Sequence, residues 1–259
     1  LSFLSYSQKI KFKNLGVIKM ERISVIAPVY NEKENISRFI SKTEKALKIR
    51  FDSYEIILID DGSTDGSREI LDREAEKNGH VKVYHFTKNN GQTAALAAGF
   101  KLCTGDFVVT MDADLQTDPE DIYVLFSYID DYDMVNGKRE TREDGLKRKF
   151  SSFVGNTVRN FITKDNIKDT GCPLKLFKKE VIESFYLFEG MHRFLPTLAK
   201  MNGFKVIEVP VRHYDREFGK SKYGIFNRLF KGLKDAFAVR WMKKRKLNYV
   251  LETGEDENV

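Results

Sequence analysis

The first half of the chain alternates short apolar runs with longer segments of helical periodicity, and this alternation is the strongest constraint on its fold. The apolar runs predict β-strands at 23–27, 54–59, 81–86, 106–111 and 132–136. Apolar residues recur at helical spacing over 32–49, 66–77 and 92–102. Pro28 is expected to end the first strand, and residues 118–121 to open a further helix. Short strands that alternate with helices predict an α/β fold, with a mostly parallel sheet and helices on both faces.

The composition places the chain among soluble globular proteins. Of its 259 residues, 41% are hydrophobic and 32% are charged, which excludes a disordered or fibrous chain. No apolar run approaches the roughly 18 residues of a membrane-spanning helix. Cys103 and Cys172 form neither a disulfide framework nor a zinc set, which favours a reducing compartment. The net charge of +6 favours an anionic partner, which could be nucleic acid, a phosphorylated substrate or a membrane.

Polar and acidic residues follow three of the predicted strands. After the first, second and fourth strands come Pro28, Tyr30, Asn31, Glu32, Asp60, Asp61, Asp112 and Asp114. Ligands of parallel sheets bind beyond the carboxyl ends of the strands, so we expect these side chains at one edge of the sheet. Carboxylates gathered there repel one another, so the site requires a cation or hydrogen-bond donors.

Asp112 and Asp114 form an Asp-x-Asp triplet directly after the fourth strand. Alternate residues of an extended segment point the same way, so both carboxylates can face one ligand, and Gln116 continues the alternation. Mg²⁺ and Mn²⁺ take oxygen ligands, and Mg²⁺ is often held by one or two carboxylates together with substrate phosphates. The triplet therefore predicts a Mg²⁺ or Mn²⁺ site at the end of this strand.

Seven segments, taken in order, resemble the family 2 glycosyltransferases of the GT-A (Rossmann-like) fold. They are VIAPVYNEKENI (25–36), ILIDDGSTDGS (57–67), NNGQTAALAAGF (89–100), VVTMDADLQTDPEDI (108–122), DTGCPLKLFKKEVI (169–182), EGMHRFLP (189–196) and VPVRHYDREFGKSKYG (209–224). The resemblance covers about 22–224. It is strongest to the dolichyl- and undecaprenyl-phosphate sugar transferases, the subgroup of dolichol-phosphate mannosyltransferase.

The resemblance implies a role for each matching residue. The donor nucleotide would be bound by Pro28, Tyr30, Glu32, Asp60, Asp61 and Asp112. The metal would be held by Asp114 and Gln116, and the donor phosphates by Arg212, Arg216 and Lys222. The catalytic set would be Asp112, Asp114 and Arg216. The acceptor phosphate would be bound by Arg139, Arg148 and Ser152, for which the alternative is a solvated charged loop.

The implied reaction is the inverting transfer of a sugar from a UDP- or GDP-linked donor to a polyprenyl phosphate, for glycan or cell-envelope synthesis. It would take place at the cytoplasmic face of a membrane. A Mg²⁺ or Mn²⁺ ion would act as a Lewis acid on the leaving diphosphate. A phosphate acceptor is already anionic at neutral pH and needs no strong general base. The sequence shows no His–carboxylate pair that demands this role, which is consistent with such an acceptor.

The segments around the resembling region differ from it in composition. Residues 1–19 carry four lysines and no acid, and are expected to form a basic arm or to lie ahead of a native start at Met20. We expect the catalytic domain at 20–224 and an acidic tail at 249–259. Between them, 225–248 predicts a basic amphipathic helix with a single acid, Asp235. This helix is expected to contact a membrane surface or a membrane-spanning partner subunit, and the alternative is a helix packed on the catalytic domain.

Other functions account for the sequence less well. A glycosyltransferase with a soluble sugar acceptor would share the motifs at the sheet edge, and so would a non-catalytic subunit that binds a nucleotide-sugar. A processive polysaccharide synthase would carry a Gln-x-x-Arg-Trp motif, whereas Phe237 precedes Arg240 and Trp241 at the glutamine position. A nucleic-acid partner is disfavoured, because the clustered carboxylates would repel its phosphates.

Overall fold

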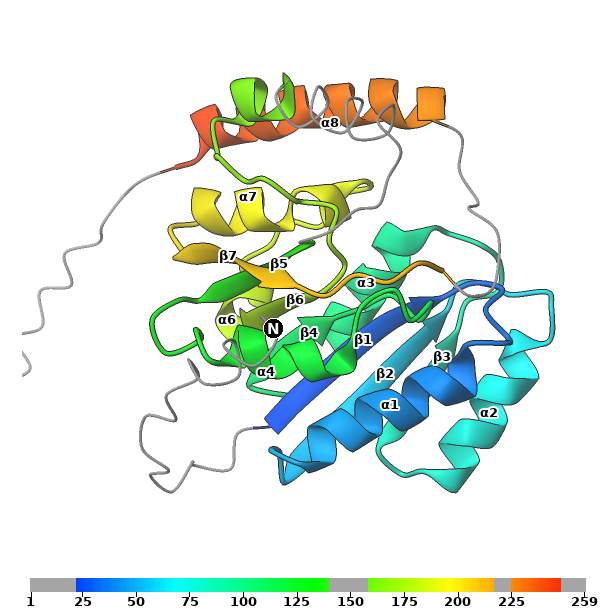
Figure 1. Cartoon of the computed structure of the whole chain (residues 1–259). Helices are drawn as coiled ribbons and strands as arrows, with labels where there is room; N and C mark the ends of the chain where they lie inside the picture. The colour runs from blue at the N-terminus through cyan, green and yellow to red at the C-terminus, as the bar shows by residue number, and fades with distance from the viewer. Residues whose placement is uncertain (1–21, 140–157, 217–224, 248–259) are drawn as a thin grey trace, which may run out of the picture.

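A seven-stranded sheet forms the centre of the computed structural model, which describes residues 22–139, 158–216 and 225–247, with side chains from 232 onward in the last range. The strand order is β3-β2-β1-β4-β6-β5-β7 (Figure 1). The strands are β1 (Arg22–Val29), β2 (Ser53–Asp60), β3 (Val81–His85), β4 (Phe107–Thr110), β5 (Met134–Arg139), β6 (Lys175–Lys178) and β7 (Val206–Val211).

One strand runs against the others. β1 pairs in parallel with β2 and β4, and β2 with β3. β6 lies antiparallel between β4 and β5, and β5 pairs in parallel with β7. The predicted α/β fold with a mostly parallel sheet is thereby confirmed. The reversal also means that β4 and β5 end, and β6 begins, at the same edge of the sheet.

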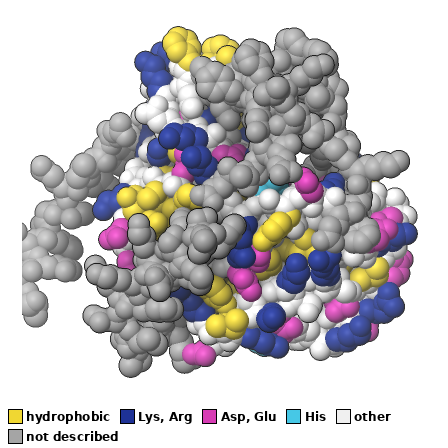
Figure 2. Space-filling view, in the orientation of Figure 1, with side chains coloured by type: hydrophobic (Ala, Val, Ile, Leu, Met, Phe, Trp, Pro, Cys, Tyr) yellow, Lys and Arg dark blue, Asp and Glu magenta, His cyan; other side chains and the backbone are white. Residues whose placement is uncertain are grey.

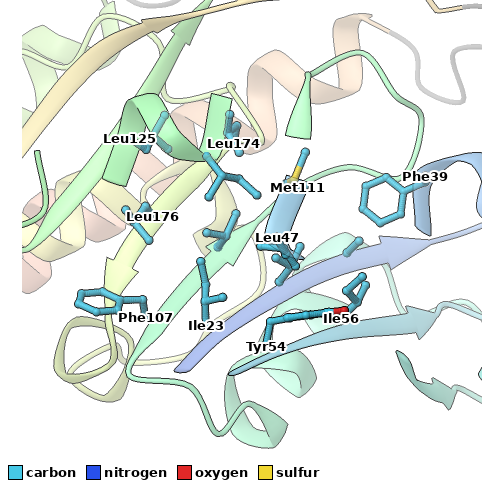
Figure 3. Close-up of a cluster of buried hydrophobic side chains, with 14 of the residues drawn as sticks. Ile23, Phe39, Leu47, Tyr54, Ile56, Phe107, Met111, Leu125, Leu174 and Leu176 are labelled. Carbon is cyan, nitrogen blue, oxygen red and sulfur yellow. The ribbon is translucent and has the colours of Figure 1, made fainter. Parts of the chain in front are cut away.

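Helices cover both faces of the sheet and enclose one apolar cluster on each. One face carries α1 (Ile36–Lys48), α2 (Ser67–Lys77), the 3-10 helix η2 (Pro119–Asp121) and α4 (Ile122–Phe126). The other carries α3 (Gln92–Leu102), α6 (Lys179–Glu183), the 3-10 helix η3 (Met191–Arg193), α7 (Leu195–Met201) and α8 (Ile225–Arg245). Successive residues of β1 serve opposite clusters. Val25 belongs to the cluster that contains Phe39 and Leu125, which Figure 3 shows, and Ile26 belongs to the cluster of α3 on the other face.

The expectation that Pro28 ends the first strand is wrong, since β1 continues to Val29. The Ile26 carbonyl accepts a hydrogen bond from Met111 N–H at 3.0 Å, so Ile26 and Pro28, two residues on, both present their backbone toward β4. The register between β1 and β4 ends at Ile26 and Thr110. Pro28 therefore lies where the missing proline N–H interrupts no ladder bond.

Other boundaries also differ from the sequence-based ones, including the first helix, which begins at Ile36 instead of 32. The fifth strand covers Met134–Arg139 instead of 132–136. The segment at 118–121 opens as η2, with the Asp118 side chain accepting from Glu120 N–H at 3.0 Å and Pro119 in the first turn. These differences arise at polar ends of elements, where backbone pairing rather than apolar periodicity sets the boundary.

α8 has two apolar faces. Ala236 and Val239 are buried against the cluster that contains α3 and α7. Phe237 and Trp241 are 60% and 62% exposed, on the opposite side, and hydrophobic side chains lie at the top of the molecule in Figure 2. The structure thus combines the packed helix and the exposed apolar face that were alternatives for this segment. Within the described ranges, no helix has both the length and the apolar character needed to cross a bilayer.

Candidate active site

The loops after β1 and β2 are tied together by backbone-to-side-chain hydrogen bonds. Asn31 N–H donates to Ser63 Oγ at 2.9 Å, and Glu32 N–H donates to Ser67 Oγ at 2.9 Å. Asn31 has a φ of 52°, a left-handed conformation that asparagine tolerates better than most residues. The loops at these two strand ends are therefore joined into one connected surface.

Asp60 and Asp61 are buried and fully engaged in ordering neighbouring turns. Asp60 accepts from Ser63 N–H at 2.9 Å and lies 2.8 Å from His85 Nδ1. Asp61 accepts from the N–H groups of Asn90 at 2.7 Å and Gly91 at 2.9 Å. Burial, together with the nearby Asp60 carboxylate, raises the pKa of Asp61 despite these bonds. Their binding of base and ribose stays a prediction.

Arg216 connects two of the predicted site carboxylates. Its Nη2 lies 2.7 Å from Glu32 Oε1 and 3.2 Å from Asp114 Oδ2. Asp114 is 9% exposed, and its other oxygen accepts from Gln116 N–H at 3.1 Å. The structure thus brings together Glu32, Asp114, Gln116 and Arg216, which come from the ends of β1 and β4 and from the segment after β7.

Asp112 is bonded to a different element, the start of α3. Its Oδ1 accepts from Gln92 Nε2 at 3.0 Å, which links the end of β4 to the first residue of α3. Burial and the neighbouring Asp114 carboxylate raise the pKa of Asp112 to about 7. A cation next to the pair would favour the charged form of both groups.

A cavity of about 1260 Å³ opens beside Asp112. Its walls come from the start of α3, the end of β4, the residues before β6, the turn at η3 and α8. The side chains that line it include those of Gln92, Thr93, Asp112, Lys175, His192, Arg193 and Asp235. The cavity is large enough for a sugar together with a phosphate group, since small-molecule sites commonly measure about 300–1,000 Å³.

The floor of the cavity contains a buried lysine. Lys175 is 2% exposed and donates to Asn136 Oδ1 at 2.9 Å, to the Thr170 carbonyl at 3.2 Å and to the Cys172 carbonyl. Burial lowers the pKa of its ammonium group. Lys175 therefore anchors the segment that leads into β6 and adds positive charge near Asp112.

Two predicted phosphate ligands are held by carboxylates of the chain itself. Arg139 makes a bidentate pair with Asp169, with Nε and Nη2 at 2.8 and 2.7 Å. Arg212 contacts Asp118, Glu120 and Asp121, the last at 2.8 Å.

Pro28 and Tyr30 lie partly buried at and just beyond the end of β1. Arg148, Ser152 and Lys222 lie outside the described residues.

Sequence reasoning missed several residues of the cavity. Gln92, Thr93 and Lys175 all fall inside the quoted family-like segments, so their signal was present, although residue type alone gave them no role. Asp235 was noted as the single acid of its helix. Its contact with η3 depends on how α8 packs, which no local pattern reveals.

The donor set at the end of β4 fits a hard divalent cation. The carboxylates of Asp112 and Asp114 are separated by a single residue. Asp114 is buried, and Arg216 already neutralises part of its charge. Among the described residues, no group of three His, Cys, Asp or Glu side chains converges on one point. Asp114 and Gln116 would therefore hold the ion together with oxygens of the donor phosphates.

Sequence comparison finds one matching family model and several relatives that match over part of their length. The model of glycosyl transferase family 2 matches residues 24–185. The undecaprenyl-phosphate 4-deoxy-4-formamido-L-arabinose transferase of Yersinia enterocolitica is 38% identical over 209 residues, which are 80% of this chain and 64% of the relative. That of Sodalis glossinidius is 39% identical over 210 residues, with the same coverage. The matched part of this chain thus spans less than two thirds of the length of these relatives.

Solved structures share the fold at low sequence identity. Glucosyl-3-phosphoglycerate synthase from Mycobacterium tuberculosis, in complex with Mn²⁺, UDP and glucosyl-3-phosphoglycerate, aligns with a TM-score of 0.64 and 15% identity over 88% of this chain and 81% of that one. A mannosyltransferase from Pyrobaculum calidifontis, in complex with GDP-Man and Mn²⁺, aligns with a TM-score of 0.60 and 20% identity over 87% and 74%. The sheet-edge carboxylates, the cavity and the family match lead to one conclusion: the chain belongs to glycosyl transferase family 2.

Proposed function

We propose that the chain transfers a sugar from a UDP- or GDP-linked donor to a polyprenyl phosphate at a membrane surface, with a Mg²⁺ or Mn²⁺ ion. The acceptor is of the undecaprenyl phosphate type named for the relatives that are 38–39% identical to this chain. The reaction inverts the anomeric centre, and the enzyme acts at the cytoplasmic face of the membrane as a peripheral protein.

The observation that carries the proposal is the group formed by Glu32, Asp114 and Arg216 beside Asp112. An arginine within 3.2 Å of a buried carboxylate next to a cavity is a site that can receive an anionic donor and its counter-ion. Glycosyl transfer needs stabilisation of the negative charge that develops on the leaving nucleoside diphosphate. Arg216 supplies a fixed positive charge for this purpose.

The residues divide the work between binding and charge stabilisation. Glu32, Asp60 and Asp61 shape the loops that receive the nucleotide. Asp114 and Gln116 would hold the divalent ion, which would supply Lewis-acid neutralisation of the diphosphate. Gln92 fixes Asp112 in place, and Lys175 supports the floor of the cavity. The phosphate acceptor arrives as an anion, so no side chain has to remove a proton from it.

The membrane surface is favoured by the two exposed aromatic residues of α8. The helical turn at 158–163 lies beside α8, since Arg240 Nη1 donates to the Ile162 carbonyl at 3.3 Å (Figure 1). Phe161, on that turn, is 76% exposed. Exposed aromatic side chains amid basic residues are typical of helices that lie in a bilayer interface. A membrane-spanning partner subunit that covers this surface is the competing proposal.

A donor screen tests the function directly. The purified chain is mixed with undecaprenyl phosphate, Mg²⁺ or Mn²⁺ and a panel of UDP- and GDP-sugars, and the glycolipid formed is measured. We expect product with one nucleotide class and none when a chelator removes the metal. Transfer to soluble sugars in place of the lipid phosphate would contradict the proposed acceptor.

The acceptor residues give a prediction that separates the two substrates. Arg148→Ala should reduce the use of polyprenyl phosphate about ten- to a hundred-fold, because a charge-assisted bond contributes about 1.5–3 kcal/mol. Arg139→Ala should have a similar effect and also destabilise the fold, because it removes the bidentate side-chain pair with Asp169. Steady-state kinetics with varied lipid and calorimetry with the nucleotide measure both. An equal loss of nucleotide affinity would contradict the assignment to the acceptor.

Membrane binding can be followed with Trp241, the single tryptophan of the sequence. We expect its fluorescence to shift to shorter wavelength with anionic vesicles, and the affinity to fall as salt rises. Phe237→Ser should weaken this binding. Tyr128→Ser, which alters an exposed aromatic residue after α4, is the matched control. If vesicles of pure lipid leave the Trp241 emission unchanged at low salt, a partner subunit takes the place of the membrane.

A further inference from the structure

The amphipathic helix α8 contributes directly to the cavity beside Asp112. Lys234 and Asp235 line it, opposite the start of α3. Asp235 is the single acid among the eight basic residues of 226–246. It points inward, with its side chain 23% exposed, whereas the neighbouring Phe237 is 60% exposed. A helix that served solely to bind a membrane would have no use for an inward carboxylate at this position.

Asp235 lies against the turn at η3. Gly190 has a φ of +91°, and a Cβ built on it would lie 2.6 Å from Asp235 Oδ2, so glycine is needed for this close approach. Asp235 Oδ2 is also 3.7 Å from Arg193 Nη1. The carboxylate therefore contacts both ends of the short segment 190–193, at the point where that segment borders the cavity.

Thr93 holds the same turn from the opposite side. Its hydroxyl accepts from Gly190 N–H at 3.1 Å and lies 2.6 Å from His192 Nδ1. Thr93 follows Gln92, the residue that donates to Asp112. The turn at η3 is thus fixed between α3 and α8, and His192 and Arg193 both border the cavity as a result.

The charges at this end of the cavity suit a neutral polar ligand. Glu189 and Asp235 balance Arg193 and Lys234, and the two hydrogen-bonding groups of Thr93 and His192 lie beside them. The other carboxylates assigned to the nucleotide, Glu32, Asp60 and Asp61, come from the ends of β1 and β2 and are not among the residues that line the cavity. The part of the donor that extends beyond the diphosphate is its sugar, which carries hydroxyl groups.

We propose that the wall formed by η3 and α8 receives the sugar of the donor, and that Asp235 is a positioning residue that holds Arg193 and the η3 turn in place. This inference rests on the proposed function. It makes α8 part of the sugar site as well as of the membrane-facing surface, and it places sugar selection in Thr93, His192 and Arg193.

Calorimetry with the full chain tests this without any lipid. The affinities for UDP and UDP-glucose, and for GDP and GDP-mannose, are measured with Mn²⁺ present. Asp235→Asn should raise the ratio of the nucleotide-sugar Kd to the nucleotide Kd about tenfold. Asp133→Asn is the matched control, since Asp133 is 22% exposed in an ion pair with Lys178 and is remote from the cavity lining. Asp133→Asn should leave the ratio unchanged, although it should lower the melting temperature about as much as Asp235→Asn does.

A second pair of variants isolates the hydroxyl of Thr93. Thr93→Val, which keeps the shape but removes the bonds to Gly190 and His192, should raise the same ratio, and Thr93→Ser should restore it. An unchanged ratio in both Asp235→Asn and Thr93→Val would overturn the inference. An equal loss of affinity for the nucleotide and the nucleotide-sugar would also overturn it, because the wall would then support the structure of the domain and not the binding of the sugar. Failure of the unaltered chain to bind any nucleotide or nucleotide-sugar would instead overturn the proposed function.

Discussion

Replacing Asp114 with asparagine is expected to preserve the fold and to reduce sugar transfer at least a hundredfold. A neutral amide is a poorer ligand for Mg²⁺ or Mn²⁺ than a carboxylate, so the leaving diphosphate would lose much of its counter-charge. The variant also weakens the contact with Arg216, which lies 3.2 Å from Asp114 Oδ2 and 2.7 Å from Glu32. Two charge-stabilising groups are therefore affected by one substitution.

The measurements are the rate of glycolipid formation and the metal concentration that gives half of the maximal rate. Asp131→Asn, a change of the same chemistry at an exposed residue outside the site, should leave both unchanged. Melting temperatures of the two variants show whether the fold is intact. If Asp114→Asn kept normal turnover and still required the metal, the ion would be bound by other residues.

Glu55→Leu is expected to lower the free energy of unfolding by about 3–5 kcal/mol, because several hydrogen-bond donors lose a buried acceptor at a cost of about 1–3 kcal/mol each. Glu55 is 1% exposed in β2 and accepts from Lys82 Nζ at 2.6 Å and from Ser24 Oγ at 2.6 Å. Thr104 donates to it through N–H and hydroxyl, both at 2.8 Å. The substitution leaves these donors without their acceptor.

The same carboxylate predicts how stability depends on pH. Burial alone would raise the pKa of Glu55, but the bonds from Lys82, Ser24 and Thr104 outweigh it and lower the pKa to about 2. A lowered pKa means that the stabilisation is complete above the unfolded value near 4.5 and is lost as the pH falls from there toward 2. The shift corresponds to about 3 kcal/mol. Chemical denaturation at pH 7 and pH 3 should show a smaller difference in Glu55→Leu than in the unaltered chain.

The strands and helices of the first half could be predicted from the sequence because each has a clear period of its own. The predicted helix at 92–102 coincides with α3, and the predicted strand at 54–59 lies within β2. The carboxylates at the strand ends could be placed at one edge because parallel strands end together. This rule needs no knowledge of side-chain contacts.

The remaining features depend on long-range packing. β6 is a four-residue strand, and its antiparallel direction is set by its pairing with β4 and β5, which no local pattern specifies. The pairing of Arg216 with Asp114 joins distant parts of the chain. In α8, Ala236 and Val239 are buried with Leu233 and Met242 packed beside them, whereas Phe237 and Trp241 are exposed, and apolar spacing alone does not tell these two faces apart.

The reversed direction of β6 determines which part of this enzyme can vary. The chain leaves the sheet after Arg139 and returns at Lys175, and both points lie at the edge that carries the site. The bidentate pair of Arg139 with Asp169, at 2.7 and 2.8 Å, closes the base of the intervening segment. The entropic cost of a closed loop grows only with the logarithm of its length, about 0.6 kcal/mol for each doubling. Insertions within 140–168 therefore add little entropic cost and need not shift the pairing of β4, β5 and β6, so under the proposed function the acceptor could change while these strands keep their register.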